Sequence, residues 1–197
     1  MFALSSVARA DTVTLTGING TGVTATVTNY SLSGNQFTFT INNTSTGSTT
    51  GTITNIGFAL PGDRSNNYTL ISSTNNNYTI VFDQNATSGS QNLVSSFDLV
   101  LCNKQNGQCT FGGGSVNNGI TPGTSATFTI SGDFSGLTAD QIAHDIFARF
   151  QNVNPGGSDV ATSGTPGTVP EPMTMILFGT GLAGVAAKVR RSRKAKA

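Results

Sequence analysis

The stretch TVTLTGINGTGVTATVTN, residues 12–29, alternates apolar and polar side chains twice in succession. Val13 and Leu15 share one face of the first segment, and Val23 and Val27 share one face of the second. A period of two is typical of a strand that buries one face. Threonine suits the other face because its branched β-carbon favours strand geometry. The stretch therefore predicts two strands, each with one side against a core.

The same alternation recurs along the chain as far as residue 131. Thr, Ser, Asn and Gly account for 93 of the 197 residues, and only 10% are charged, which is a composition poor in helix formers. We predict a mainly β fold, an antiparallel β-sandwich whose core is supplied mostly by the 12 phenylalanines. The predicted strands cover residues 12–16, 22–29, 37–41, 52–60, 67–72, 77–83, 93–101 and 125–131.

One segment departs from this pattern, LTADQIAHD at residues 137–145. Thr138 is followed three positions later by Gln141, which is the spacing of a helix capping box. Residues 146–153 could extend a helix or form a strand, and we predict one short helix over 138–145 with a last strand after it. His144 lies on this helix, and we interpret it as a surface residue because the adjacent Asp145 points elsewhere on a helix. The chain also contains no Gly-x-Ser-x-Gly nucleophile motif.

The domain organisation follows from composition. Residues 1–10 are interpreted as the remnant of a signal peptide, because Ala8-Arg9-Ala10 has the small-x-small form that precedes cleavage between Ala10 and Asp11. The alternative is an ordinary N-terminal tail. Residues 11–153 form the predicted extracytoplasmic sandwich domain, and the Gly- and Pro-rich residues 154–168 form a predicted flexible linker.

The last segment, residues 169–197, contains an apolar run followed by basic residues. No charge occurs from Met173 to Ala187, and Val189 extends the run past Lys188. A helix from Met173 to Val189 would rise about 25 Å, enough for a slightly short membrane span. A buried core helix is the weaker alternative because the run is apolar on every face. The basic residues that should stay in the cytoplasm are Arg190, Arg191, Arg193 and Lys194.

Pro170, Glu171 and Pro172 stand directly before this run. The two prolines favour an extended backbone that an enzyme can bind, although prolines also simply begin helices. Residues 169–194 resemble the PEP-CTERM sorting signal of Gram-negative bacteria. The resemblance implies processing by an exosortase, a membrane transpeptidase-like enzyme of organisms that make exopolysaccharide or biofilm. It specifies where the protein is sent and leaves the activity of the domain open.

The two cysteines, Cys102 and Cys109, enclose the segment CNKQNGQC. Because Asn106-Gly107 favours a tight turn and the chain is predicted to be exported, we interpret the pair as a structural disulfide. The spacing is not that of a redox pair, and no histidine is close enough in sequence for a zinc site. We predict no metal site, no cofactor and no catalytic residue.

The charge of the predicted domain argues against one class of partner. Between residues 11 and 168 there are three basic and eight acidic residues, a net charge of −5, so we expect no nucleic-acid binding. All eight acidic residues are aspartates scattered along the sequence. A pair of them acting as in a polysaccharide hydrolase is the enzymatic alternative.

We therefore expect a non-enzymatic surface or matrix protein. It would be exported, held transiently in the inner membrane with its domain in the periplasm, cut near Pro170–Pro172, and delivered to the cell surface or extracellular matrix. Extracellular polysaccharide is a candidate ligand, contacted through polar faces and through Tyr30, Tyr68 and Tyr78. A domain that stays anchored in the membrane without processing is a third hypothesis.

Overall fold

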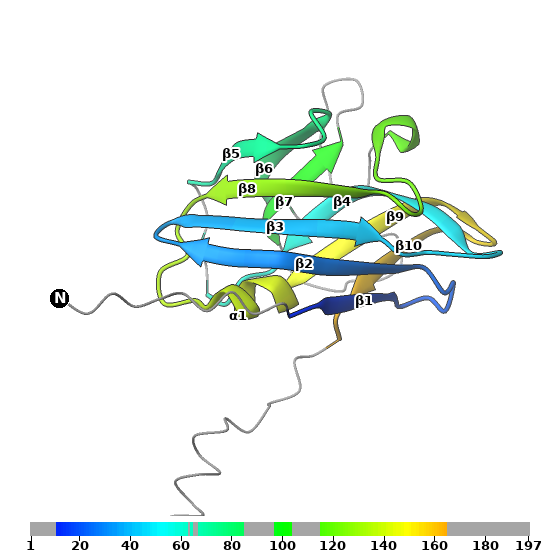
Figure 1. Ribbon diagram of the computed structural model, residues 1–197, viewed down its shortest axis with the longest axis horizontal. Helices are drawn as coiled ribbons and strands as arrows, with labels where there is room; N and C mark the ends of the chain where they lie inside the picture. Colours follow the sequence, from blue (N-terminus) through cyan, green and yellow to red (C-terminus); the bar gives the residue numbers. More distant parts are fainter. Residues whose placement is uncertain (1–10, 63, 65–66, 85–96, 104–114, 165–197) are drawn as a thin grey trace, which may run out of the picture. The chain divides into compact units, whose positions relative to one another are not determined.

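The computed structural model describes residues 11–62, 64, 67–84, 97–103 and 115–164. The predicted segments 1–10 and 169–197 lie outside the described residues. The chain divides into two compact units, Met1–Gly164 and Thr165–Ala197, and the description below concerns the first. The elements are β1 (Val13–Gly17), β2 (Thr24–Ser33), β3 (Gln36–Asn43), β4 (Thr50–Phe58), β5 (Thr69–Ser73), β6 (Tyr78–Gln84), β7 (Phe97–Asn103), η1 (Val116–Asn118), β8 (Ser125–Ser131), α1 (Ala139–His144), β9 (Ile146–Asn154) and β10 (Gly157–Thr162) (Figure 1).

The mainly β, antiparallel prediction is confirmed, and each of the eight expected strand segments overlaps an observed strand. The strands belong to one hydrogen-bonded sheet, in the order β5-β8-β3-β2-β1-β10-β9-β4-β7-β6, rather than to the two separate sheets of the expected sandwich. β5 and β6 are consecutive in sequence yet lie at the two ends of this order. Because residues 74–77 alone connect them, the sheet curls until its ends approach each other.

The weakest pairing in the sheet is its middle, between β1 and β10. Two residue pairs define it, Thr16 with Thr162 and Gly17 with Ala161, whereas β3 and β8 form seven pairs. We call β5, β8, β3, β2 and β1 the first leaf, and β10, β9, β4, β7 and β6 the second leaf.

The core lies between the leaves. Phe39 of β3 and Phe58 of β4 are far apart in the strand order, yet their ring centroids are 5.5 Å apart. Phe128 of β8 and Tyr78 of β6 are in contact in the same way, at 5.1 Å. These edge-to-face contacts join aromatic rings of opposite leaves, and fully burying such side chains is the main source of stability. Phenylalanine supplies most of the largest fully buried side chains, but aliphatic residues outnumber it among the described core residues, so the prediction that phenylalanine supplies most of the core is only partly right.

The helix α1 confirms the capping-box prediction. The Thr138 hydroxyl accepts a hydrogen bond from the Gln141 backbone N–H at 3.2 Å, and the Gln141 side chain accepts one from the Thr138 backbone N–H at 2.9 Å. Two backbone donors at the start of the helix are thereby satisfied. β9 follows at Ile146, as expected.

The expected linker requires a correction. Gly157–Thr162, placed in the linker from composition, forms β10, which pairs with β9 along its length. Gly156 and Gly157 both have positive φ, a conformation that glycine adopts without strain, and this pair forms the turn that reverses the chain between β9 and β10. The glycines therefore form a defined turn here and not a flexible linker. The compact unit therefore extends to Gly164.

Candidate functional site

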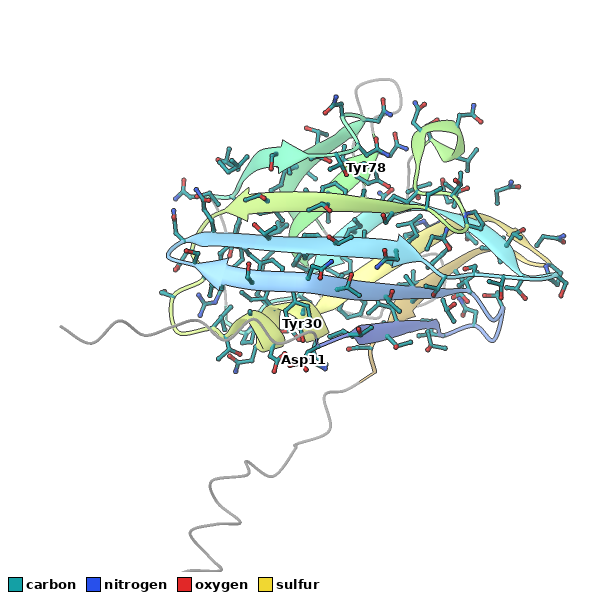
Figure 2. The ribbon with its side chains drawn as sticks, viewed as in Figure 1. Asp11, Tyr30 and Tyr78 are labelled. Carbon is teal, nitrogen blue, oxygen red and sulfur yellow. The ribbon has the colours of Figure 1, made fainter. Side chains whose placement is uncertain are left out.

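The predicted sorting residues lie beyond the described part of the chain. This applies to Pro170, Glu171 and Pro172, to the span Met173–Val189, and to the basic residues Arg190, Arg191, Arg193 and Lys194. Within the described ranges, no helix has the length and apolar character needed to cross a membrane. Ala10 is also outside these ranges, whereas Asp11 lies just before β1 (Figure 2).

Cys102 lies on β7 and is fully buried. It belongs to a small buried cluster with Phe97, Val100 and Val160, separate from the main core. Its predicted partner Cys109 lies outside the described residues, so the disulfide stays a prediction. Cys102, the one cysteine among the described residues, is not a free thiol.

Charged side chains cluster between the start of β7 and the loop that follows β4. Asp98 of β7 accepts a hydrogen bond from the Leu60 backbone N–H at 2.7 Å and another from the Arg64 backbone N–H at 3.2 Å. Its two carboxylate oxygens are thus both used to hold the backbone of residues 60–64. Asp98 was one of the scattered aspartates of the sequence, and only the fold shows that it anchors a loop.

Arg64 connects this loop to the segment that precedes α1. Its Nε donates to the Pro61 carbonyl at 2.8 Å, and one guanidinium nitrogen lies 3.7 Å from the Asp133 carboxylate. Asp133 also accepts hydrogen bonds from the Ser135 hydroxyl and backbone N–H, and these bonds, helped by Arg64, hold its pKa below the ordinary value. The Arg64–Asp133 pair is exposed on the aspartate side, so its contribution to stability is small.

Asp145 is the most perturbed carboxylate among the described residues. It caps the C-terminal end of α1, and its backbone carbonyl accepts a hydrogen bond from the Ala59 N–H at 3.1 Å. Partial burial raises its pKa to about 6, with a smaller upward contribution from the Asp98 charge, while His144 acts in the opposite direction.

His144 and Asp140 serve the helix and its neighbour. His144 Nδ1 lies 2.8 Å from the Asp140 backbone carbonyl oxygen. Because a carbonyl oxygen can only accept, Nδ1 bears the hydrogen and is the donor of this hydrogen bond. The Asp140 carboxylate accepts a hydrogen bond from the Tyr30 hydroxyl at 2.6 Å. Asn29 has a φ of 51° at an irregularity in β2, and Figure 2 shows the following Tyr30 beside α1.

Two of the three tyrosines expected to contact a ligand are instead buried in the core. Tyr78 is 3% exposed, donates its hydroxyl to the Ile53 carbonyl at 2.7 Å, and has a pKa raised by burial. Tyr68 is 2% exposed, packs on Phe134 with ring centroids 5.3 Å apart, and has a pKa raised by burial to about 12. Both belong to the core, because their rings add apolar area and their hydroxyls find backbone acceptors there. Tyr30 alone remains partly accessible.

Asp159, on β10, has a structural role that sequence reasoning missed. It is 2% exposed, and its carboxylate accepts hydrogen bonds from Asn19, Thr21 and its own neighbour Val160. A buried carboxylate needs such donors, because an unpaired charge in the interior is costly. The sequence signal was weak, since Asp159 stands in a stretch whose glycines and prolines indicated a linker.

Over the described residues, no three His, Cys, Asp or Glu side chains are placed to hold a metal ion. Arg149 of β9 is half-buried, and this burial lowers its pKa below the ordinary value. The described aspartates mostly anchor loops and helix ends.

Comparison with known proteins identifies the C-terminal segment. A family model described as the PEP-CTERM protein-sorting motif matches residues 168–191, which include Pro170–Pro172 and the apolar run. No curated protein and no solved structure matches the chain. The prediction of the sorting signal is thus confirmed on a short part of the sequence, and the domain before it has no matched relative. The chain carries the PEP-CTERM sorting signal of an exported protein that an exosortase processes at the membrane.

Proposed function

We propose that this protein is a non-enzymatic component of the cell surface or extracellular matrix. Met173–Val189 first holds the chain in the inner membrane. The chain is then cut near Pro170–Pro172, and the sheet domain is delivered to the cell surface or extracellular matrix. The observation that carries the proposal is the sorting motif at residues 168–191, attached to a domain in which four aspartate carboxylates, those of Asp98, Asp133, Asp140 and Asp159, accept internal hydrogen bonds.

The use of the carboxylates supports a structural or binding role. Asp98 holds the loop at residues 60–64, Asp133 bonds Ser135, Asp140 bonds Tyr30, and Asp159 holds the loop between β1 and β2. A general acid or base needs a lone pair or proton that it can exchange with a substrate. Carboxylates that accept several internal hydrogen bonds are poor candidates for that exchange.

The sorting part of the proposal is tested in native cells. Replacing Pro170, Glu171 and Pro172 together by alanine should leave the full-length chain in the inner-membrane fraction. The matched control is Pro166→Ala, which removes a proline from the adjacent segment without touching the motif. Surface delivery of the triple variant at the wild-type level would contradict the proposal, and so would membrane retention of both wild type and Pro166→Ala as unprocessed chains.

A second candidate function is a polysaccharide hydrolase that uses Asp98 and Asp145. It is favoured by one observation, the pKa of Asp145 near 6, which suits a general acid. Against it, the Asp98 oxygens already bond the loop backbone. The test is release of reducing ends from the producing cell's own exopolysaccharide by wild type, Asp145→Asn and the control Asp11→Asn. Activity that Asp145→Asn abolishes and Asp11→Asn retains would favour the hydrolase.

A further inference from the structure

Several asparagines of the chain stand in the sequence Asn-x-Ser or Asn-x-Thr, with x other than proline, which is the acceptor motif for N-linked glycans. They are Asn19, Asn29, Asn42, Asn43, Asn67, Asn77 and Asn85. All but Asn85 belong to the described residues. In a chain rich in Asn and Thr such motifs also arise by chance, so the motif alone selects none of them. The fold, however, separates the described ones into two groups of three.

The asparagines of the first group use their amides inside the fold. Asn43 is 1% exposed, and its amide donates to two buried backbone carbonyls at 2.7 and 2.8 Å. The Asn42 amide donates to the hydroxyls of two threonines of β2, at 3.2 and 3.1 Å. The Asn19 amide donates to the Asp159 carboxylate at 2.7 Å. An enzyme that attaches a sugar must reach the amide nitrogen, so these three are poor acceptors.

The asparagines of the second group, Asn29, Asn67 and Asn77, are exposed. Asn29 has a φ of 51° at the irregularity in β2, Asn67 stands shortly before β5, and Asn77 directly precedes β6. The Asn77 amide donates to the Asn75 side chain at 3.1 Å, in a bond exposed to solvent. None of the three stands opposite a partner in the strand register, so an enzyme can bind these segments without opening the sheet.

The sequence singles out the same three motifs by a separate criterion. Their middle residue is tyrosine, and Tyr30, Tyr68 and Tyr78 are all the tyrosines of the chain. Asn accounts for 19 of the 197 residues and Ser and Thr together for 50, so composition alone would rarely place Asn before and Ser or Thr after every tyrosine. The middle residues of the first group are Gly, Asn and Thr. Exposure and sequence therefore agree on one set of sites.

The tyrosines fix the orientation of these motifs. Tyr68 and Tyr78 are 2% and 3% exposed, and Tyr30 packs against the core (Figure 2). Neighbouring side chains of an extended segment point to opposite faces, so a buried tyrosine leaves the Asn before it and the Thr after it on the outer side. Thr69 and Ser31 are exposed accordingly. The hydroxyl that the motif requires is thus presented on the same side as the amide.

We propose that Asn29, Asn67 and Asn77 carry N-linked glycans. The sugar donor is an oligosaccharide linked to a lipid diphosphate, which the exported chain meets at the membrane where it is processed. The amide nitrogen forms a bond to C1 of the first sugar, and the bond from C1 to the diphosphate breaks. The lipid diphosphate leaves, and the amide proton passes to a base of the transferring enzyme. The inference rests on the export in the proposed function and adds a covalent modification to it.

Two of these glycans have a role at the edges of the sheet. β5 and β6 are the terminal strands of the order, and Asn67 and Asn77 stand at their beginnings. β5 contains no charged residue, and its Ile71 is 51% exposed. The unpaired edge of such a strand can pair with another chain, and a bulky hydrophilic group beside it hinders that approach.

The test is mass spectrometry of peptides from the protein made in native cells, with the membrane and surface fractions read separately. We expect a sugar-containing mass on Asn29, Asn67 and Asn77, and none on Asn43. Thr69→Ala should reduce the occupancy of Asn67 at least tenfold, because the motif loses its hydroxyl. Thr69→Ser is the matched control and should keep the occupancy of wild type. Thr69 is exposed, and circular dichroism checks that both variants fold.

Wild-type protein with Asn29, Asn67 and Asn77 all unmodified would overturn the proposal, and so would sugars confined to Ser and Thr side chains. Equal occupancy of Asn67 in wild type and in folded Thr69→Ala would also overturn it, as would a glycan on Asn43. A failure of surface delivery is distinguishable from these results. It changes the fraction in which the modified peptides are found and leaves their presence unchanged.

Discussion

The Asn19 side-chain amide donates to the Asp159 carboxylate at 2.7 Å, joining the loop after β1 to β10 at the weakest pairing of the sheet. Thr21 and two backbone N–H groups donate to the same carboxylate. β1 and β10 share only two residue pairs, and this buried carboxylate adds side-chain hydrogen bonds beside the backbone bond from the Ile18 N–H to the Val160 carbonyl.

Asp159→Ala should therefore destabilise the domain. The substitution leaves several partly buried donors without an acceptor, and we expect a loss of about 3 kcal/mol in the free energy of unfolding. Urea unfolding followed by circular dichroism measures it. Asp140→Ala, which removes one exposed bond to Tyr30, is the control and should cost less than about 1 kcal/mol. Equal losses for the two variants would contradict the connecting role of Asp159.

The capping box of α1 provides a smaller, local prediction. Thr138→Ala removes the acceptor of the Gln141 backbone N–H, and we expect a loss of about 1 kcal/mol. Thr138→Ser keeps the hydroxyl and should retain most of the stability. Chemical unfolding of the three proteins checks the order wild type, Thr138→Ser, Thr138→Ala. If serine were as destabilising as alanine, the hydroxyl would not be the stabilising group.

Asp145 makes stability depend on pH. Its folded-state pKa of about 6 lies above its ordinary value of 3.8, so the folded chain binds this proton more tightly than the unfolded chain does. The contribution is fully present below pH 3.8 and is lost as the pH rises through 6. Since Asp145 is half-buried and solvent screens its charge, we expect a change of about 1 kcal/mol.

Thermal unfolding between pH 3.5 and pH 7.5 measures this effect. Asp145→Asn should reduce the dependence of the melting temperature on pH. At pH 7 this variant should melt at a higher temperature than wild type, because the amide is neutral and its partial burial desolvates no charge. His144→Gln should move the loss of stability to higher pH, since His144 lowers the pKa of Asp145. An unchanged slope in Asp145→Asn would assign the pH dependence to another group.

The predicted disulfide has its own test. Cys109→Ser opens a loop of eight residues, and chain entropy then predicts a loss of about 2.5 kcal/mol. Alkylation of the denatured, unreduced wild-type protein should label no thiol, and mass spectrometry reads the number directly. Two labelled thiols in protein taken from the periplasm would contradict the pairing of Cys102 with Cys109.

Local structure followed from the sequence because it depends on neighbours along the chain. The Thr-rich alternation in β2 and the Thr138–Gln141 spacing each specify an element without reference to distant residues. β10 was missed because Gly156, Gly157 and Asp159 all disfavour strands by composition. What makes it a strand is its pairing with β9 and the buried bonds of Asp159, and neither is visible in a short window of sequence.

The pairing order and the use of polar groups also depend on contacts distant in sequence. β4 pairs with both β7 and β9, and the sequence of β4 alone does not indicate which strands it pairs with. The same holds for Tyr68 and Tyr78, which composition allowed on the surface and the fold buries. The sorting motif is different, because its recognition depends on the order of residues alone, and it was predicted with nearly the matched boundaries.

The most direct test of the account is the mass of the mature C-terminus, measured by mass spectrometry on protein from native cells with and without the exosortase. We predict that wild-type cells yield a chain that has lost the residues after Pro170–Pro172, and that cells lacking the enzyme yield the uncut chain. A C-terminus ending at Ala197 in the membrane fraction of wild-type cells would contradict sorting by cleavage, and would favour a domain that stays anchored.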